Sequence, residues 1–169
     1  MTGDPEYLLK YLAQHRFLLD KRGAHGPRHW LRVRDRGVEL CRSTGADPKL
    51  VTLFAYLHDA FRYYENDDPE HGLRAAKSIM HLRHNDMIKI SYADSEVLYR
   101  ACRLHSDGIT VDDDITVMTC WDADRLDLGR VGITPDPKYL CTDAAKKMLR
   151  RELRGIIHPR LSSWHSEQT

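Results

Sequence analysis

The chain contains 169 residues, with 26 basic and 25 acidic residues and a formal net charge of +1. This length fits one compact domain, residues 1–169, and is too short for two independent cores. The balanced charge disfavours non-specific nucleic-acid binding, and no apolar run approaches the roughly 20 residues that cross a bilayer. The first residues also lack the order of charges and apolar residues that marks a signal peptide. We therefore expect a soluble, cytoplasmic protein.

Helical periodicity dominates the chain and strand signals are few, so we expect an all-α fold of six or seven helices in one compact bundle. Prolines, glycines and polar cap residues set the expected boundaries. Gly45 is expected to stop the helix over 28–43, and Ser91 with Asp94 has the form of a capping box at the start of another. Helices are expected to begin at Pro5 and Pro48, and to cover residues 28–43, 69–83, 91–105, 113–128 and 142–155.

Three details of these helices can be checked directly. The apolar run that follows Pro48 predicts a central helix that carries His58 and Asp59 in its last turns. Asp68 is expected to cap the helix over 69–83. Thr142 is expected to cap the last helix, which should end near Gly155.

The four cysteines are widely spaced and form no C-x-x-C pair. This spacing argues against a zinc knuckle and against a dithiol redox motif. We expect all of them to be reduced and most to be buried: Cys41, Cys102, Cys120 and Cys141.

The ten histidines are the unusual feature of the composition, because imidazole is a common metal ligand. His29, the adjacent pair His58–Asp59 and the acids near residue 124 lie on segments expected to be helical. If these segments converge, imidazoles and carboxylates together form a site that suits Mn, Fe, Co, Ni or Zn. Without convergence, His29 would simply pack beside Trp30.

Three motifs, in this order along the chain, resemble those of the HD-domain metal-dependent phosphohydrolase superfamily. They are H-x-x-R-V at 29–33, L-H-D at 57–59 and D-A-D-R-L-D at 122–127, and the resemblance covers roughly residues 25–135. It implies a helical bundle of the HD type. It also implies that a divalent transition metal is held by His29, His58, Asp59 and Asp124.

Two further histidines extend the resemblance, His71 in E-H-G-L-R-A-A and His105 in L-H-S-D-G. In two-metal members of the superfamily the equivalent histidines hold a second ion, and the aspartate of the pair bridges the two ions. In one-metal members, histidines of this region contact phosphate or transfer protons. The resemblance therefore implies one or two ions and leaves the roles of His71 and His105 open.

Arginines flank the expected ligands, and a guanidinium group matches phosphate oxygens bidentately. We expect Arg62 or Arg125 to neutralise phosphate charge, although ion pairing with nearby acids explains any one of these arginines equally well. The others are Arg28, Arg32 and Arg130. The basic residues between 146 and 154 are interpreted as a solvated helix face.

The remaining candidates are weaker. Asp124 shares a helical face with Val117 and Trp121, whereas Asp122 and Asp127 are either acceptors for ligand side chains or surface acids. His25 is undecided, because the turn that follows it would allow it to approach the mouth of the site. The other histidines are expected on the surface: His15, His81, His84, His158 and His165.

The resemblance implies a metal-dependent phosphohydrolase in which an ion-activated water attacks a phosphoester or phosphoanhydride of a small phosphorylated metabolite. Likeness to small bacterial members favours a nucleotide. The residues implied in catalysis are Asp59, His71, His105, Arg62 and Arg125. Two alternatives remain: a di-iron oxygenase of the same superfamily, and a domain that binds metal or nucleotide without turnover.

Overall fold

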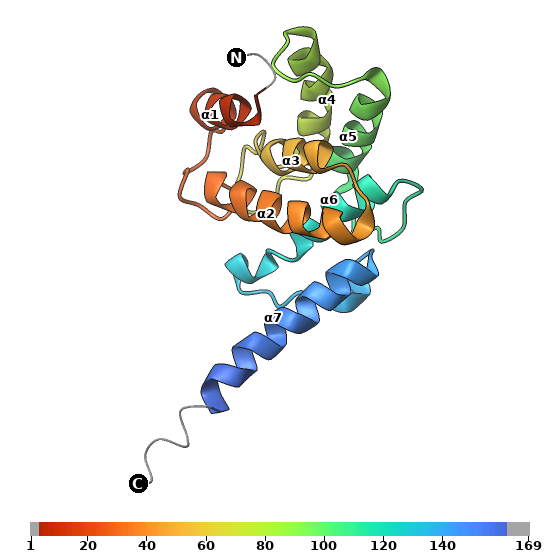
Figure 1. Ribbon diagram of the computed structural model, residues 1–169. Helices are drawn as coiled ribbons and strands as arrows, with labels where there is room; N and C mark the ends of the chain where they lie inside the picture. Colours follow the sequence, from red (N-terminus) through yellow and green to blue (C-terminus); the bar gives the residue numbers. More distant parts are fainter. Residues whose placement is uncertain (1–3, 162–169) are drawn as a thin grey trace.

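The structure, a computed structural model, describes residues 4–161, with side chains up to residue 155. Within these residues it contains helices and no strand, which confirms the expected all-α fold (Figure 1). The α-helices are α1 (Pro5–His15), α2 (Pro27–Thr44), α3 (Pro48–Leu57), α4 (His71–His84), α5 (Tyr92–Leu104), α6 (Ile115–Arg125) and α7 (Asp143–Leu161). Two short 3₁₀ helices, η1 (Leu128–Val131) and η2 (Pro137–Tyr139), lie between α6 and α7.

Helix α3 lies at the centre of the bundle, in contact with α1, α2, α5 and α6 (Figure 1). All of its residues from Leu50 to Leu57 are buried except Thr52, which explains why its sequence is apolar nearly all round. Helices α4 and α5 pack together beside it, and α7 packs against α2 and α6. This arrangement brings the C-terminal end of α3 and the N-terminal end of α4 close to the middle of the bundle.

Two glycines allow helices of the bundle to approach closely, and the second of them does so beside the site. A Cβ atom on Gly37 of α2 would collide with Val51 of α3. A Cβ atom on Gly72 of α4 would lie 2.7 Å from the carbonyl oxygen of Cys102 in α5. The second contact holds the start of α4 directly against the end of α5, where His71 and His105 lie.

Several expected caps are confirmed. Ser91 and Asp94 form a reciprocal capping box at the start of α5. Gly45 ends α2 in the left-handed conformation, with a φ of 78°. The Thr142 hydroxyl accepts a hydrogen bond from the Ala145 amide, at 3.1 Å, and so caps α7.

Other boundaries differ from the expected ones. Helix α3 ends at Leu57, so His58 and Asp59 lie at the start of the turn after it instead of in its last turns. Asp68 does not cap α4, because its carboxylate accepts the Tyr63 amide and pairs with Arg74, and the helix begins at His71.

At the other end of the chain, α6 ends at Arg125 and not at residue 128, since the chain tightens into the 3₁₀ turn η1. Helix α7 continues through Gly155 to Leu161. An exposed glycine inside a helix costs only about 1 kcal/mol, which the rest of the helix can offset. In the part of the chain that the structure describes, no helix combines the length and apolar character needed to cross a membrane.

Candidate metal centre

Four buried histidines from four different elements converge at the centre of the bundle. His29 lies in the first turn of α2, His58 follows α3, His71 begins α4 and His105 follows α5. Their exposed fractions are 0%, 0%, 4% and 4% respectively. The motifs that lie far apart in the sequence therefore meet at one place, together with Asp59 and Asp124.

The four imidazole rings are oriented in the same way. In each ring Nδ1 faces a fixed acceptor: the Asp127 carboxylate for His29, the Phe54 and Ala55 carbonyls for His58, the Asp68 carbonyl for His71 and the Cys102 carbonyl for His105. A carbonyl or carboxylate accepts a hydrogen bond only from a protonated nitrogen, so these partners assign the proton to Nδ1. Nε2 is thereby the nitrogen directed toward the centre in each ring, as in histidines that bind metal.

The first group of converging atoms comes from His29, His58, Asp59 and Asp124. His29 Nε2 lies 3.0 Å from His58 Nε2, 3.5 Å from Asp59 Oδ2 and 3.3 Å from Asp124 Oδ1. His58 Nε2 lies 3.4 Å from Asp59 Oδ2 and 3.7 Å from Asp124 Oδ1. Ligands about 2.0–2.1 Å from a tetrahedral ion are about 3.4 Å from one another, so this spacing suits a single transition metal ion.

Asp124 Oδ1 gives an independent test of that fit. The atom is buried and has no hydrogen-bond partner among the described residues. An unsatisfied carboxylate oxygen in the interior is costly, and a bound cation would satisfy it. The donor set therefore fits a divalent metal ion, as the sequence predicts.

The second group consists of Asp59, His71 and His105. His71 Nε2 lies 2.9 Å from His105 Nε2 and 3.4 Å from Asp59 Oδ1, and His105 Nε2 lies 3.8 Å from the same oxygen. The two oxygens of Asp59 thus face the two groups separately. The guanidinium of Arg62 also reaches this group, with Nη1 at 3.1 Å from His71 Nε2 and 3.3 Å from Asp59 Oδ1.

The pKa values of the metal-free site reflect a dense cluster of acids. Burial lowers the pKa of His29, but the adjacent carboxylates of Asp124, Asp127 and Asp59 outweigh it and raise the pKa to about 10. Burial would raise the pKa of Asp124, but the same imidazole and the charge of His58 hold it well below its usual range. These acids therefore stay ionised and attract positive charge.

The pKa of His105 moves in the opposite direction. Burial lowers it to about 4, and the nearby charge of His58 adds to this effect. Burial likewise lowers the pKa of His71. Both rings are neutral at pH 7, which is the state needed for a metal ligand or for an acceptor of hydrogen bonds.

The two uncertain acids behave differently. Asp127 accepts a hydrogen bond from His29 Nδ1 at 2.8 Å and also pairs with Arg32, so it orients a candidate ligand. Asp122 is turned away from the histidines, and it accepts the backbone amides of Cys141 and Thr142. Its role is to fix the start of α7.

A pocket of ≈ 310 Å³ opens onto the second group. Arg125 lines it, and although its Nη1 donates to the Tyr139 carbonyl at 2.7 Å, its Nη2 is buried without a hydrogen-bond partner among the described residues. Arg62 also lines it, but its remaining donors contact the Tyr64 and Asn66 carbonyls. The two arginines therefore differ in what they can offer a ligand.

The sequence left His25 undecided, and the structure places it in the wall of this pocket, hydrogen-bonded to Glu65 at 2.8 Å. Tyr139 in η2 also lines the pocket and was not expected, because a three-residue 3₁₀ turn has no periodic signal. Of the histidines expected on the surface, His15, His81 and His84 are exposed, whereas His158 and His165 lie outside the residues whose side chains are described. All four cysteines are free, and only Cys141 is not fully buried.

Comparison with known proteins supports the fold. No protein-family model matches the sequence, and no curated protein matches it. One solved structure is similar, a predicted HD superfamily hydrolase from an uncultured Thermotogales bacterium, with a TM-score of 0.68 and 21% identity over 94% of this chain and 92% of that one. The likeness confirms the expected HD-type helical bundle, and at this identity it concerns the fold alone.

Proposed function

We propose that this chain is a metal-dependent phosphohydrolase of the HD superfamily. The observation that carries the proposal is the convergence of two Nε2 atoms and two carboxylate oxygens at the spacing of one ion's ligands, with Asp124 Oδ1 otherwise unsatisfied. His29, His58, Asp59 and Asp124 would hold the ion. When bound, a divalent ion polarises a phosphoryl oxygen and lowers the pKa of a water molecule toward 7.

The protein's own groups have distinct tasks in this proposal. Arg125 offers its free Nη2 to a phosphate oxygen in the pocket, where burial strengthens a charge-assisted hydrogen bond. Neutral His105 and His71 border the same space and can accept a proton. Leu128 and Tyr139 supply apolar surface for the remainder of a small phosphorylated metabolite, for which we propose a nucleotide.

Arg62 has a positioning task instead. Its contacts with Asp59, His71 and two carbonyls use four of its five N–H donors within the protein, so it has little to offer a substrate in this arrangement. Its positive charge also lies against the second group of candidate ligands. We therefore propose that a single metal ion binds to the first group of candidate ligands. The Arg62 guanidinium provides the positive charge beside the second group.

This placement favours hydrolysis over oxygen activation by two irons. A second ion bound by Asp59, His71 and His105 would have to displace Arg62 Nη1 from both Asp59 and His71. Metal counting on the wild type and on Arg62→Gln tests this point. One ion in the wild type supports the proposal, and two irons in the wild type would replace it with the oxygenase.

Activity is tested on metal-free protein reloaded separately with Mn²⁺, Fe²⁺, Co²⁺, Ni²⁺ or Zn²⁺. Phosphate release is measured over a panel of nucleoside mono-, di- and triphosphates and sugar phosphates. We expect turnover with at least one metal, its loss in Asp59→Asn, and its retention in His81→Ala, an exposed histidine of α4. Binding of a nucleotide with no phosphate release under any metal would favour the non-catalytic alternative.

A further inference from the structure

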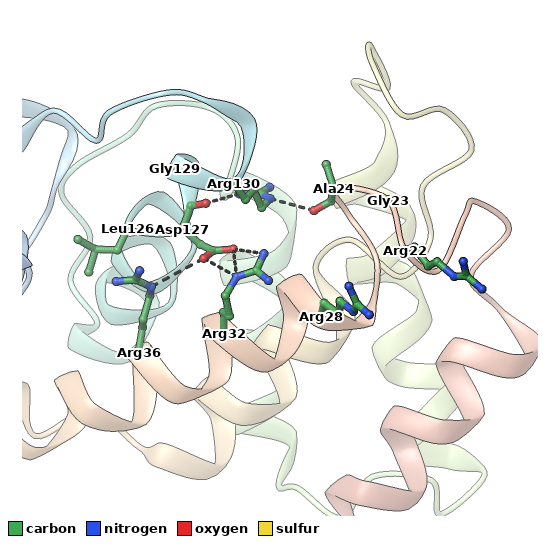
Figure 2. A pocket seen from close by; sticks show the side chains of 10 residues that line it. All are labelled: Arg22, Gly23, Ala24, Arg28, Arg32, Arg36, Leu126, Asp127, Gly129 and Arg130. Carbon is green, nitrogen blue, oxygen red and sulfur yellow. Dashed lines mark hydrogen bonds and ion pairs between the residues drawn. The ribbon is translucent and has the colours of Figure 1, made fainter. Parts of the chain in front are cut away.

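A second pocket, of ≈ 490 Å³, lies beside the candidate metal centre and is lined by five arginines (Figure 2). Its walls come from the segment between α1 and α2, from one face of α2 and from the chain around η1. The arginines are Arg22, Arg28, Arg32, Arg36 and Arg130. The sequence suggested only three of these as phosphate ligands, and it placed them around the metal.

Helix α2 explains why the arginines gather. Arg28, Arg32 and Arg36 are spaced four residues apart, so they share one face of the helix, and Figure 2 shows them along the wall opposite Arg130. Like charges at this spacing destabilise an isolated helix. The arrangement is therefore unfavourable for α2 alone, and a negatively charged partner would relieve the repulsion between the arginines.

The protein itself supplies little of that negative charge. Among the described residues, Asp127 is the only acid that lines the pocket, and it already bonds to Arg32 and His29. Arg36 pairs with Glu152, which lies outside the lining. Neither Arg22 nor Arg28 has a side-chain hydrogen bond or ion pair to any residue that the structure describes.

We propose that this pocket binds a small anion with several linked phosphates, such as a triphosphate chain. The backbone of α2 advances about 12 Å from Arg28 to Arg36, which is further than one phosphate group can bridge. Linked phosphates present successive charges along such a row, and the guanidinium groups of Arg22 and Arg28, which have no side-chain partner among the described residues, can bond bidentately to them. A cavity with walls on several sides favours a compact anion over the extended backbone of a nucleic acid.

This site is separate from the candidate metal centre. None of the candidate metal ligands lines it, and the two linings share Arg130. The proposal therefore does not depend on hydrolase activity or on a bound metal. It can be tested on the full metal-free chain.

The test is calorimetric titration of the metal-free protein with sodium tripolyphosphate, in parallel with inorganic phosphate. We expect saturable binding of tripolyphosphate that weakens with salt and is at least about tenfold tighter than that of phosphate, since tenfold corresponds to about 1.4 kcal/mol and one additional charge-assisted hydrogen bond is enough to supply it. Arg28→Glu and Arg22→Glu should each weaken binding about tenfold. Both side chains lack internal partners among the described residues, so the thermal melting curve should not change.

Arg42→Glu is the matched control, because Arg42 is an exposed arginine of the same helix outside the pocket. Its effect should be less than twofold. Equal losses in Arg28→Glu and Arg42→Glu, or no binding of tripolyphosphate at 1 mM in about 50 mM salt, would overturn the proposal. Tighter binding of a single-stranded RNA oligomer, abolished by Arg28→Glu, would replace the small anion with nucleic acid.

Discussion

The candidate metal centre and the pocket lined by five arginines, here called the arginine pocket, are neighbours with opposite charge. The candidate metal centre is buried and gathers acids and imidazoles, whereas the arginine pocket is open and gathers guanidinium groups. Each contains charge that the protein does not neutralise by itself. The net charge of +1 for the whole chain is therefore an average that conceals two local imbalances. Acids are in excess at the candidate metal centre, and arginines are in excess in the arginine pocket.

Asp127 stands between the two regions. One of its oxygens accepts the Nδ1 proton of His29, and the carboxylate also binds Arg32 and lies 3.8 Å from Arg36. A single side chain thus orients a candidate metal ligand and restrains two arginines of the neighbouring pocket. Substitutions that affect the two regions differently are therefore the most informative tests of the account.

The largest effect is expected from His58→Ala. Loss of one of four candidate ligands should reduce the metal content of the purified protein to background and lower phosphate release by more than about 10³-fold, because a metal ion supplies most of the activation. The arginine pocket should still bind tripolyphosphate. Retention of stoichiometric metal in this variant, measured by mass spectrometry of the elements, would exclude His58 as a ligand.

Asp127→Asn should affect the two regions in opposite directions. Removing the charged acceptor behind a metal-bound histidine costs about 10–100-fold in metal affinity. Removing the only acid of the arginine pocket should strengthen tripolyphosphate binding several-fold. Chelator competition and calorimetry measure the two affinities. Asp35→Asn, an exposed acid of α2, is the control, and equal shifts in both variants would contradict the role of Asp127.

Gly72→Ala should loosen the second group of candidate ligands. The added Cβ would lie 2.7 Å from the Cys102 carbonyl and 3.1 Å from that of Arg103, so α4 and α5 must separate. Overpacking of this kind costs about 1–3 kcal/mol, measurable by denaturant unfolding. Gly155→Ala in α7, where the described residues leave open space around the added atom, should be neutral or stabilising. If Gly155→Ala lowered the free energy of unfolding as much as Gly72→Ala, the close contact between α4 and α5 would not be the cause of the destabilisation.

The smallest expected effect is a proton release. The pKa of His29 is raised to about 10 in the metal-free fold, above an ordinary value of 6.5, so its proton stabilises the metal-free protein below pH 6.5 and this contribution is lost as the pH rises through about 10. Metal binding at pH 7 must expel that proton. Calorimetry in buffers of different ionisation enthalpy should report about one proton per ion. No dependence on the buffer would contradict the protonated state of His29.

Most of the fold was predictable because its signals are local. The run after Pro48, the capping box at Ser91 and the left-handed Gly45 each fix an element from a few neighbouring residues. The errors occurred where tertiary contacts override local preference. Asp68 looks like a helix cap in sequence, but it is held by Arg74 and by the Tyr63 amide instead.

The candidate site was predictable only as a set of residue types. Motif order indicated which histidines belong together, but it did not show that Arg62 lies against His71, or that Asp127 and not Asp122 supports His29. Those outcomes depend on side-chain directions at the ends of helices. The arginine pocket was missed for the same reason, since Arg22 and Arg130 are distant in sequence and meet only through the packing of η1 near the start of α2.

The central claim is that one divalent ion belongs among His29, His58, Asp59 and Asp124. Anomalous X-ray diffraction from crystals of the purified protein, recorded on both sides of the absorption edges of Mn, Fe, Co, Ni and Zn, tests it most directly. The account predicts one dominant peak about 2.0–2.3 Å from these four side chains. A metal peak elsewhere, or none in protein grown with all five metals, would contradict it.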